Sequence, residues 1–200
     1  VGARQDAIYV YKTVLDEDPD HAAAAERLSG LFEEDGDAEQ LVELLARRLD
    51  RARDREDVAT IVALSLQMGA LIEPSDPSAA VDFYRGGLDW EPKSRALLEA
   101  LLGHYDEGAD PRERAELMER LLEVSEGPRG AELANQLIAA YQALDDEYGA
   151  MRALDLGFRA HPNDPSLRGR LESLYREREE WAELASMIVH DARHREDVDA

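Results

Sequence analysis

One hydrophobic pattern recurs three times along the chain. Each copy has a small residue, an aromatic residue or Leu four positions on, a small or β-branched residue three further, and a proline five residues after that. The copies are Ala7/Tyr11/Val14/Pro19, Ala80/Tyr84/Gly87/Pro92 and Ala150/Leu154/Gly157/Pro162. Offsets of four and three place these residues on one stripe of an α-helix, and the proline ends the helix. The pattern therefore predicts three equivalent amphipathic helices.

Further helices are predicted between these copies, because apolar residues keep helical spacing there and Gly, Asp and Pro residues interrupt it. The predicted count is eleven helices, one unpaired at the start and then five hairpins. After the first copy they cover about 22–34, 38–53, 56–72, 78–90, 94–107, 112–125, 131–144 and 148–160, then a helix capped by 163–165 and a last one over 181–194. No stretch alternates as a strand would, and the glycine-rich residues 126–130 are the expected place for a bend.

The period and the marked positions together resemble the tetratricopeptide repeat. The three prolines lie about 70 residues apart, which is two units of about 35 residues. In that family the second helix of a repeat carries the offsets found here, and the first helix carries Leu, a small residue and Tyr. Leu28/Ser29/Phe32 fits the first-helix pattern, and Met68/Gly69/Ile72 fits it in part. Alternate repeats lack the terminal proline, which is similar to the arrays of large bacterial proteins.

The resemblance implies an all-α fold, a right-handed α-solenoid of stacked antiparallel helix hairpins formed by 1–200 as a single segment. The first helix has no partner before it, and residues 192–198 echo residues 52–58, so we expect the chain to be a fragment of a longer array. Apolar surface around Ile8, Tyr11 and Leu15 should then be exposed, which would allow end-to-end self-association.

The resemblance also implies where a ligand binds, because the first helices of stacked hairpins line a concave groove. One groove position carries small residues, which either leave an open floor or let helices approach: Gly30, Ala70, Gly103, Ala139 and Ser173. Two further positions supply the candidate ligand-binding side chains: Glu26, Glu33, Glu73, Glu99, Asp106, Asn135, Gln142 and Arg176. They are mostly negative in the first three hairpins, so the expected ligand is a basic peptide or partner helix. The alternative is that these carboxylates form a solvated face.

Composition narrows the range of partners. The chain has 45 Asp and Glu residues against 23 Lys and Arg residues, a net charge of −22, so it should repel nucleic acid and anionic membranes. No apolar run is long enough for membrane insertion. The absence of cysteine excludes disulfides and thiolate metal sites and is compatible with either redox compartment.

No sequence pattern indicates catalysis. There is no phosphate-binding glycine loop and no nucleophile elbow. His190 and His194 have a spacing that can ligate zinc, but no Glu base follows the first histidine, so we interpret them as surface residues and expect no metal or cofactor. The other histidines and the tryptophans are assigned structural roles: capping or packing for His21 and His161, a polar face for His104, and packing between repeats for Trp90 and Trp181.

The leading hypothesis is a non-enzymatic protein-interaction scaffold that binds a peptide or partner helix in its concave groove. The main alternative is a structural spacer or self-associating array that links other domains. A third hypothesis is an enzyme whose catalytic domain lies outside this segment.

Overall fold

The computed structural model describes residues 2–105 and 110–198, with side chains as far as residue 189. The chain divides into two compact units, Val1–His104 and Tyr105–Ala200. Every described element is an α-helix or a turn, and the helix boundaries agree with the prediction to within a few residues at most ends.

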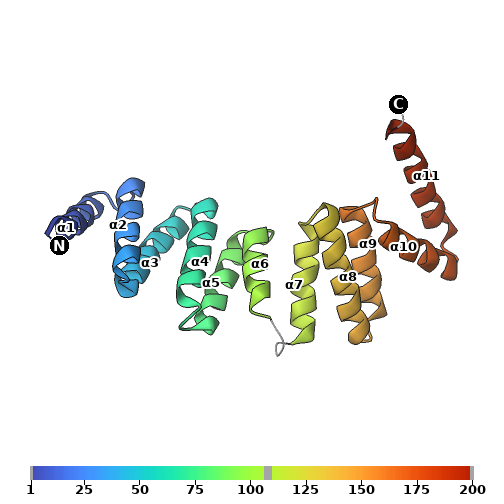
Figure 1. Cartoon of the computed structure of the whole chain (residues 1–200), viewed down its shortest axis with the longest axis horizontal. Helices are drawn as coiled ribbons and strands as arrows, with labels where there is room; N and C mark the ends of the chain where they lie inside the picture. The colour runs from blue at the N-terminus through green and yellow to red at the C-terminus, as the bar shows by residue number, and fades with distance from the viewer. Residues whose placement is uncertain (1, 106–109, 199–200) are drawn as a thin grey trace. The chain divides into compact units, whose positions relative to one another are not determined.

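The first unit contains six helices, in which consecutive helices pack side by side (Figure 1). They are α1 Gly2–Glu17, α2 Ala22–Asp35, α3 Ala38–Asp54, α4 Val58–Ile72, α5 Pro77–Trp90 and α6 Arg95–Gly103. The second unit contains α7 Pro111–Glu123, α8 Gly127–Ala143, α9 Glu147–Ala160, α10 Pro165–Glu177 and α11 Trp181–Val198. Each unit is a stack of antiparallel hairpins, so the all-α class and the hairpin repeat predicted from the sequence are confirmed.

Aspartate begins most of the helices, because its carboxylate accepts a hydrogen bond from an otherwise unpaired N–H of the first turn. The capping residues are Asp37, Asp57, Asp76, Asp110, Asp146 and Asp164. His21 does the same for α2, with Nδ1 accepting from the N–H of Ala24 at 3.1 Å, which confirms its predicted capping role. Proline ends helices as expected: Glu91 and His161, each directly before a proline, have φ of −132° and −145° and leave the helical region.

Four of the turns between helices share one hydrogen-bonded form. In each, a residue with left-handed backbone ends the helix, and the next N–H donates to a carbonyl five residues back. The left-handed residues are Gly36, Glu56, Asp145 and Glu179, with φ of 67°, 54°, 53° and 58°. The closing bonds are Asp37 N–H to Phe32 O, Asp57 N–H to Ala52 O, Asp146 N–H to Tyr141 O and Glu180 N–H to Tyr175 O, each at 2.9 Å. Such a turn returns the chain antiparallel to the helix before it.

Glycines at the marked positions let neighbouring helices approach closely. A Cβ on Gly87 of α5 would lie 2.9 Å from Ser65 Cβ and 2.7 Å from a methyl of Leu97. A Cβ on Gly157 of α9 would lie 2.3 Å from Ala134 Cβ and 3.2 Å from a methyl of Leu167. The same triple arrangement therefore recurs in both units, as a structural repeat requires.

The first helix packs on the core but is not enclosed by it. Ile8, Tyr11 and Leu15 are half-buried against a cluster that includes Phe32 and Leu45. The exposed apolar side chains of α1 are instead Tyr9 at 72% and Val10. The apolar surface expected on this helix is therefore present, but on neighbouring residues rather than those predicted.

Two helices differ from the sequence-based boundaries. The sixth helix ends at Gly103, short of the predicted residue 107. The eighth begins at Gly127 and takes in the glycine-rich stretch as its first turn, because Pro128 suits the start of a helix and Gly130 packs against Ala160. The bend at 126–130 and the single segment 1–200 stay predictions.

Candidate functional site

A hollow of about 980 Å³ lies on the α2 side of the first unit, at the predicted groove. Glu26, Gly30 and Glu33 line it together, because their offsets of four and three place them on one stripe of α2. A Cβ on Gly30 would meet nothing within 4 Å, so the floor is open there. Gln67 of α4 donates from Nε2 to Glu33 Oε1 at 3.4 Å and forms the adjacent wall. The hollow offers the carboxylate oxygens of Glu26 and Glu33 to a cationic or hydrogen-bond-donating ligand, and Arg27 and Arg48 also line it.

Two of the other acidic candidates, Glu73 and Glu99, do not line this hollow. Glu73 caps the end of α4, with Oε1 3.3 Å from Nε2 of His104 and Oε2 accepting from the Tyr84 hydroxyl at 3.4 Å. Burial and the charge of Glu73 raise the pKa of Tyr84. Glu99 pairs with Arg95 on its own helix at 2.9 Å. Asp106 lies outside the described residues.

His104 does not lie on a polar face, so that interpretation was wrong. Its side chain is 11% exposed and packs with its ring centroid 5.6 Å from that of Tyr84. The histidine fills the space at the end of α6 and meets the Glu73 carboxylate, which gives its polar edge a partner.

A hollow of about 1110 Å³ lies between α8, α9 and α10 of the second unit, and Gln142 forms part of its lining. Asn135 accepts from Arg170 Nη1 at 3.0 Å through Oδ1. Arg176 pairs with Glu172 at 3.0 Å, and the hydrogen bonds from Arg168 and Arg176 lower the pKa of Glu172. Among these three, Gln142 is the side chain that reaches the hollow.

A polar network that the sequence did not indicate links three helices of the second unit. Arg152 of α9 donates to both carboxylate oxygens of Glu119 on α7, at 3.0 and 3.3 Å, and Tyr141 of α8 donates to the same carboxylate. Burial, then the hydrogen bond to Glu119, raises the pKa of Tyr141 to about 12. Burial alone would raise the pKa of Glu119, but the bonds from Arg152 and Tyr141 outweigh it and lower that pKa. These partners are 22 and 33 residues from Glu119, beyond the reach of a local pattern.

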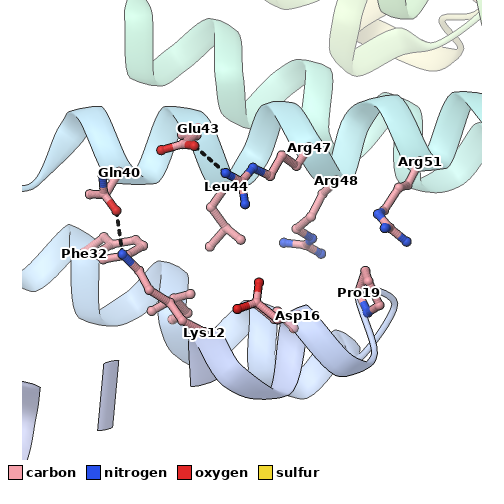
Figure 2. Close-up of a pocket in the computed structure, with 12 residues that line it drawn as sticks. Lys12, Asp16, Pro19, Phe32, Gln40, Glu43, Leu44, Arg47, Arg48 and Arg51 are labelled. Carbon is pink, nitrogen blue, oxygen red and sulfur yellow. Dashed lines mark hydrogen bonds and ion pairs between the residues drawn. The ribbon is translucent and has the colours of Figure 1, made fainter. Parts of the chain in front are cut away.

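A basic pocket is the second feature that sequence reasoning missed. Arg47, Arg48 and Arg51 of α3 line a cavity of about 520 Å³ together with Lys12 of α1 (Figure 2). Within the part of the chain that the structure describes, no three His, Asp or Glu side chains are placed to hold a metal ion. The side chains of His190 and His194 lie outside it. No helix among the described residues is long and apolar enough to cross a membrane.

The two tryptophans differ from one another. Trp90 packs against the core cluster of the first unit, as expected. Trp181 is 59% exposed at the start of α11, so the prediction that it packs between repeats was wrong.

Comparisons with known proteins found structural likenesses only. No family model matches the chain, and a search of curated proteins found no match. A crystal structure of MamA is 17% identical with a TM-score of 0.46, covering 80% of this chain and 89% of that one. A second structure of MamA is 12% identical with a TM-score of 0.43, covering 92% and 89%. A thermophilic TPR protein in Thermus thermophilus is 15% identical with a TM-score of 0.39, covering 86% and 90%.

The chain is an α-helical repeat protein whose marked positions resemble those of the tetratricopeptide repeat. Its own helices carry this conclusion, since the marked small residues lie where helices touch and the marked prolines lie where helices end.

Proposed function

We propose that the protein is a non-enzymatic interaction scaffold whose first unit binds a basic peptide or partner helix in the hollow beside α2. The observation that supports this is the hollow of about 980 Å³, with Glu26 and Glu33 at its edge and the open position of Gly30 between them. Cavities of several hundred Å³ accept a few peptide side chains. Carboxylates at the rim attract lysine and arginine and speed association more than they tighten binding.

A defined probe tests this proposal. A synthetic amphipathic peptide with Lys and Arg on one face and Leu on the other is titrated into the isotope-labelled protein while amide shifts are followed. Saturable shifts should centre on 22–35. In the double variant Glu26→Gln/Glu33→Gln, association should slow several-fold at low salt, with a smaller change in dissociation.

The matched control is Glu116→Gln/Glu123→Gln. These two glutamates are exposed on α7, carry the same spacing along a helix, and change the net charge by the same amount. If the control slows association as much as the groove variant, the effect comes from total charge and the groove assignment fails. Shifts spread over the whole chain would contradict it as well.

Self-association is the second candidate function, and the exposed apolar side chains favour it. Tyr9 and Val10 project from α1, and Trp181, Ile188 and Val189 from α11. Single exposed apolar residues are ordinary, but neighbouring ones on one helix form a surface that another copy can cover. Sedimentation velocity over a range of concentrations should then show larger species, and Tyr9→Glu/Val10→Glu should remove them. A monomer at all concentrations would exclude this function.

A further inference from the structure

The basic pocket is formed by two helix stripes that face each other. On α1 and the turn after it the lining residues are Lys12, Leu15, Asp16 and Pro19; on α3 they are Gln40, Glu43, Leu44, Arg47, Arg48 and Arg51. Both sets follow helical offsets of three and four, so each stripe presents one face to the cavity. Phe32 of α2, labelled in Figure 2, and Leu28 of the same helix complete the lining. The pocket thus combines apolar walls with cationic side chains at its edge.

The position of Arg48 sets this pocket apart from the rest of the chain. Counted from the capping aspartate of its helix, Arg48 stands where Gly87 stands in α5 and Gly157 stands in α9. Those glycines lie in spaces that have no room for a Cβ. An arginine cannot occupy such a space, and Arg48 instead borders both the pocket and the acidic hollow beside α2. At this position α3 therefore carries a half-buried cation in place of the close helix packing that α5 and α9 make through glycine.

The cations of the pocket differ in how they are neutralised. Lys12 donates to Gln40 Oε1 at 2.7 Å and lies 5.5 Å from the centre of the Phe32 ring. Arg47 pairs with Glu43, and Arg51 Nη1 is 3.6 Å from Asp20 Oδ1. Arg48 makes no hydrogen bond or ion pair with any residue that the structure describes.

Arg48 is also the cation with the most to gain from a new partner. Burial lowers the pKa of its guanidinium, and the negative charge of Glu26 opposes that effect only in part. A half-buried charge without a hydrogen-bonded partner is unfavourable, and a guanidinium binds a carboxylate through two parallel hydrogen bonds. An anionic group that enters the pocket beside Arg48 would remove this cost.

The charge balance of the lining agrees with such a ligand. Four cationic side chains face two anionic ones, Asp16 and Glu43, in a chain whose net charge is −22. The volume of about 520 Å³ is enough for two or three side chains, and the apolar walls suit an aromatic or aliphatic one. We propose that this pocket binds an acidic peptide segment of another protein, with a carboxylate on Arg48 and an apolar side chain between Leu15 and Leu44. Arg48 borders both cavities, but this proposal does not rest on the proposed function of the α2 hollow.

Direct titration with defined peptides tests the proposal. The probe is a blocked peptide, acetyl-Gly-Glu-Phe-Asp-Glu-Leu-Gly-amide, and binding is measured by calorimetry and by the Nε–Hε signals of the arginines. Measurements are made at ~0.15 M salt, which screens the electrostatic repulsion from carboxylates more than about 8 Å away. Saturable binding should shift the Arg48 and Arg47 signals. A peptide with Gln and Asn in place of Glu and Asp should bind roughly tenfold more weakly, because charge-assisted hydrogen bonds are lost.

Two variants on the same helix separate the pocket from total charge. Arg48→Met keeps the apolar stem and removes the guanidinium, and it should weaken the probe peptide about tenfold or more. Arg53→Met removes the same charge from another face of α3, where Arg53 pairs with Asp50 at 3.6 Å, and should leave the dissociation constant within about twofold. Lys12→Met, on the exposed side of α1, should weaken binding several-fold and serves if Arg48→Met unfolds the protein.

Several results would overturn the proposal. Equal affinity for the acidic and the amide peptide, equal losses in Arg48→Met and Arg53→Met, or no saturable binding at millimolar peptide would each do so. So would a mass that rises with protein concentration and returns to the monomer in Arg48→Met, because the occupant would then be a second copy of this chain. In Glu26→Gln/Glu33→Gln the acidic peptide should bind as tightly or more tightly, because the charge of Glu26 partly offsets the burial of Arg48 and its loss leaves the guanidinium with more to gain.

Discussion

Replacing Gly157 by alanine tests how closely α8 and α9 approach. The added Cβ would lie 2.3 Å from the Cβ of Ala134, about 1 Å short of normal contact between carbon atoms. Neither Cβ can move by rotating a side chain, because each is fixed to a helix backbone. The helices must therefore separate, and overpacking of this kind costs about 1–3 kcal/mol. Alanine has a higher intrinsic helix preference than glycine, which offsets up to about 1 kcal/mol of this cost. A net loss of stability of up to about 2 kcal/mol remains.

Urea unfolding followed by circular dichroism gives the measurement. At a denaturant dependence of about 2 kcal/mol per molar urea, the midpoint of Gly157→Ala should fall by up to roughly 1 M. Gly169→Ala is the matched control, because Gly169 lies inside α10 of the same unit and an added Cβ there meets nothing within 4 Å. That control should raise the midpoint through helix preference alone.

A double variant identifies the contact itself. Ala134→Gly removes the atom that the new methyl group strikes, so Ala134→Gly combined with Gly157→Ala should recover roughly 1–2 kcal/mol relative to the sum of the single changes. If Gly157→Ala stabilised the protein as Gly169→Ala does, the close approach of these helices would be refuted.

Four further predictions concern a helix cap, a turn, a buried carboxylate and the net charge. Asp146→Ala removes the hydrogen bond to the N–H of Gly149 at 2.8 Å and should lower the free energy of unfolding by about 1 kcal/mol. Glu179→Gly replaces a residue held in a left-handed backbone conformation by one that adopts it without steric penalty, and should raise the urea midpoint. The pKa of Glu119 is lowered in the folded state, so the ionised carboxylate stabilises the fold at pH values above the ordinary pKa of a glutamate. This stabilisation is lost as the pH falls through the folded-state pKa. Glu119→Gln should therefore reduce the loss of stability on acidification, measured by urea midpoints at neutral and acid pH. The melting temperature should rise as salt is added from very low ionic strength, because screening weakens repulsion in a chain of net charge −22, and a flat profile would show that the carboxylates are compensated locally.

Local pattern predicted most of the fold. The stripes, the prolines and the aspartates located the helices because helix formation and termination depend on residues a few positions apart. It placed the start of the eighth helix at about 131 rather than at Gly127, because the glycine and proline residues there indicate a joint but also suit the first turn of a helix. It also failed at Trp181, because whether a tryptophan is covered depends on neighbours that the local sequence does not define.

The candidate sites were predicted less well, for the same reason. Glu26 and Glu33 share a hollow because they share a helix face, which spacing alone can show. Glu73 does not line this hollow, because its carboxylate contacts His104, which follows another helix. The basic pocket combines Lys12 with residues about 35 positions later, so it required the packing of α1 near α3. The sequence indicated it only through an arginine at the position, counted from the capping aspartate, where α5 and α9 have glycine.

The shared turn has a consequence for how this chain acquires its structure. Each closing bond spans five residues, so a hairpin can be completed without waiting for distant parts of the chain. Proteins dominated by such short-range contacts have low contact order and fold quickly, and in a repeat array any hairpin can nucleate. The order of nucleation then depends on turn chemistry: Gly36 adopts the left-handed backbone without steric penalty, whereas Glu56 and Glu179 each oppose it. We expect the α2–α3 hairpin to be among the first to form during synthesis or refolding, and the α10–α11 hairpin to be among the last.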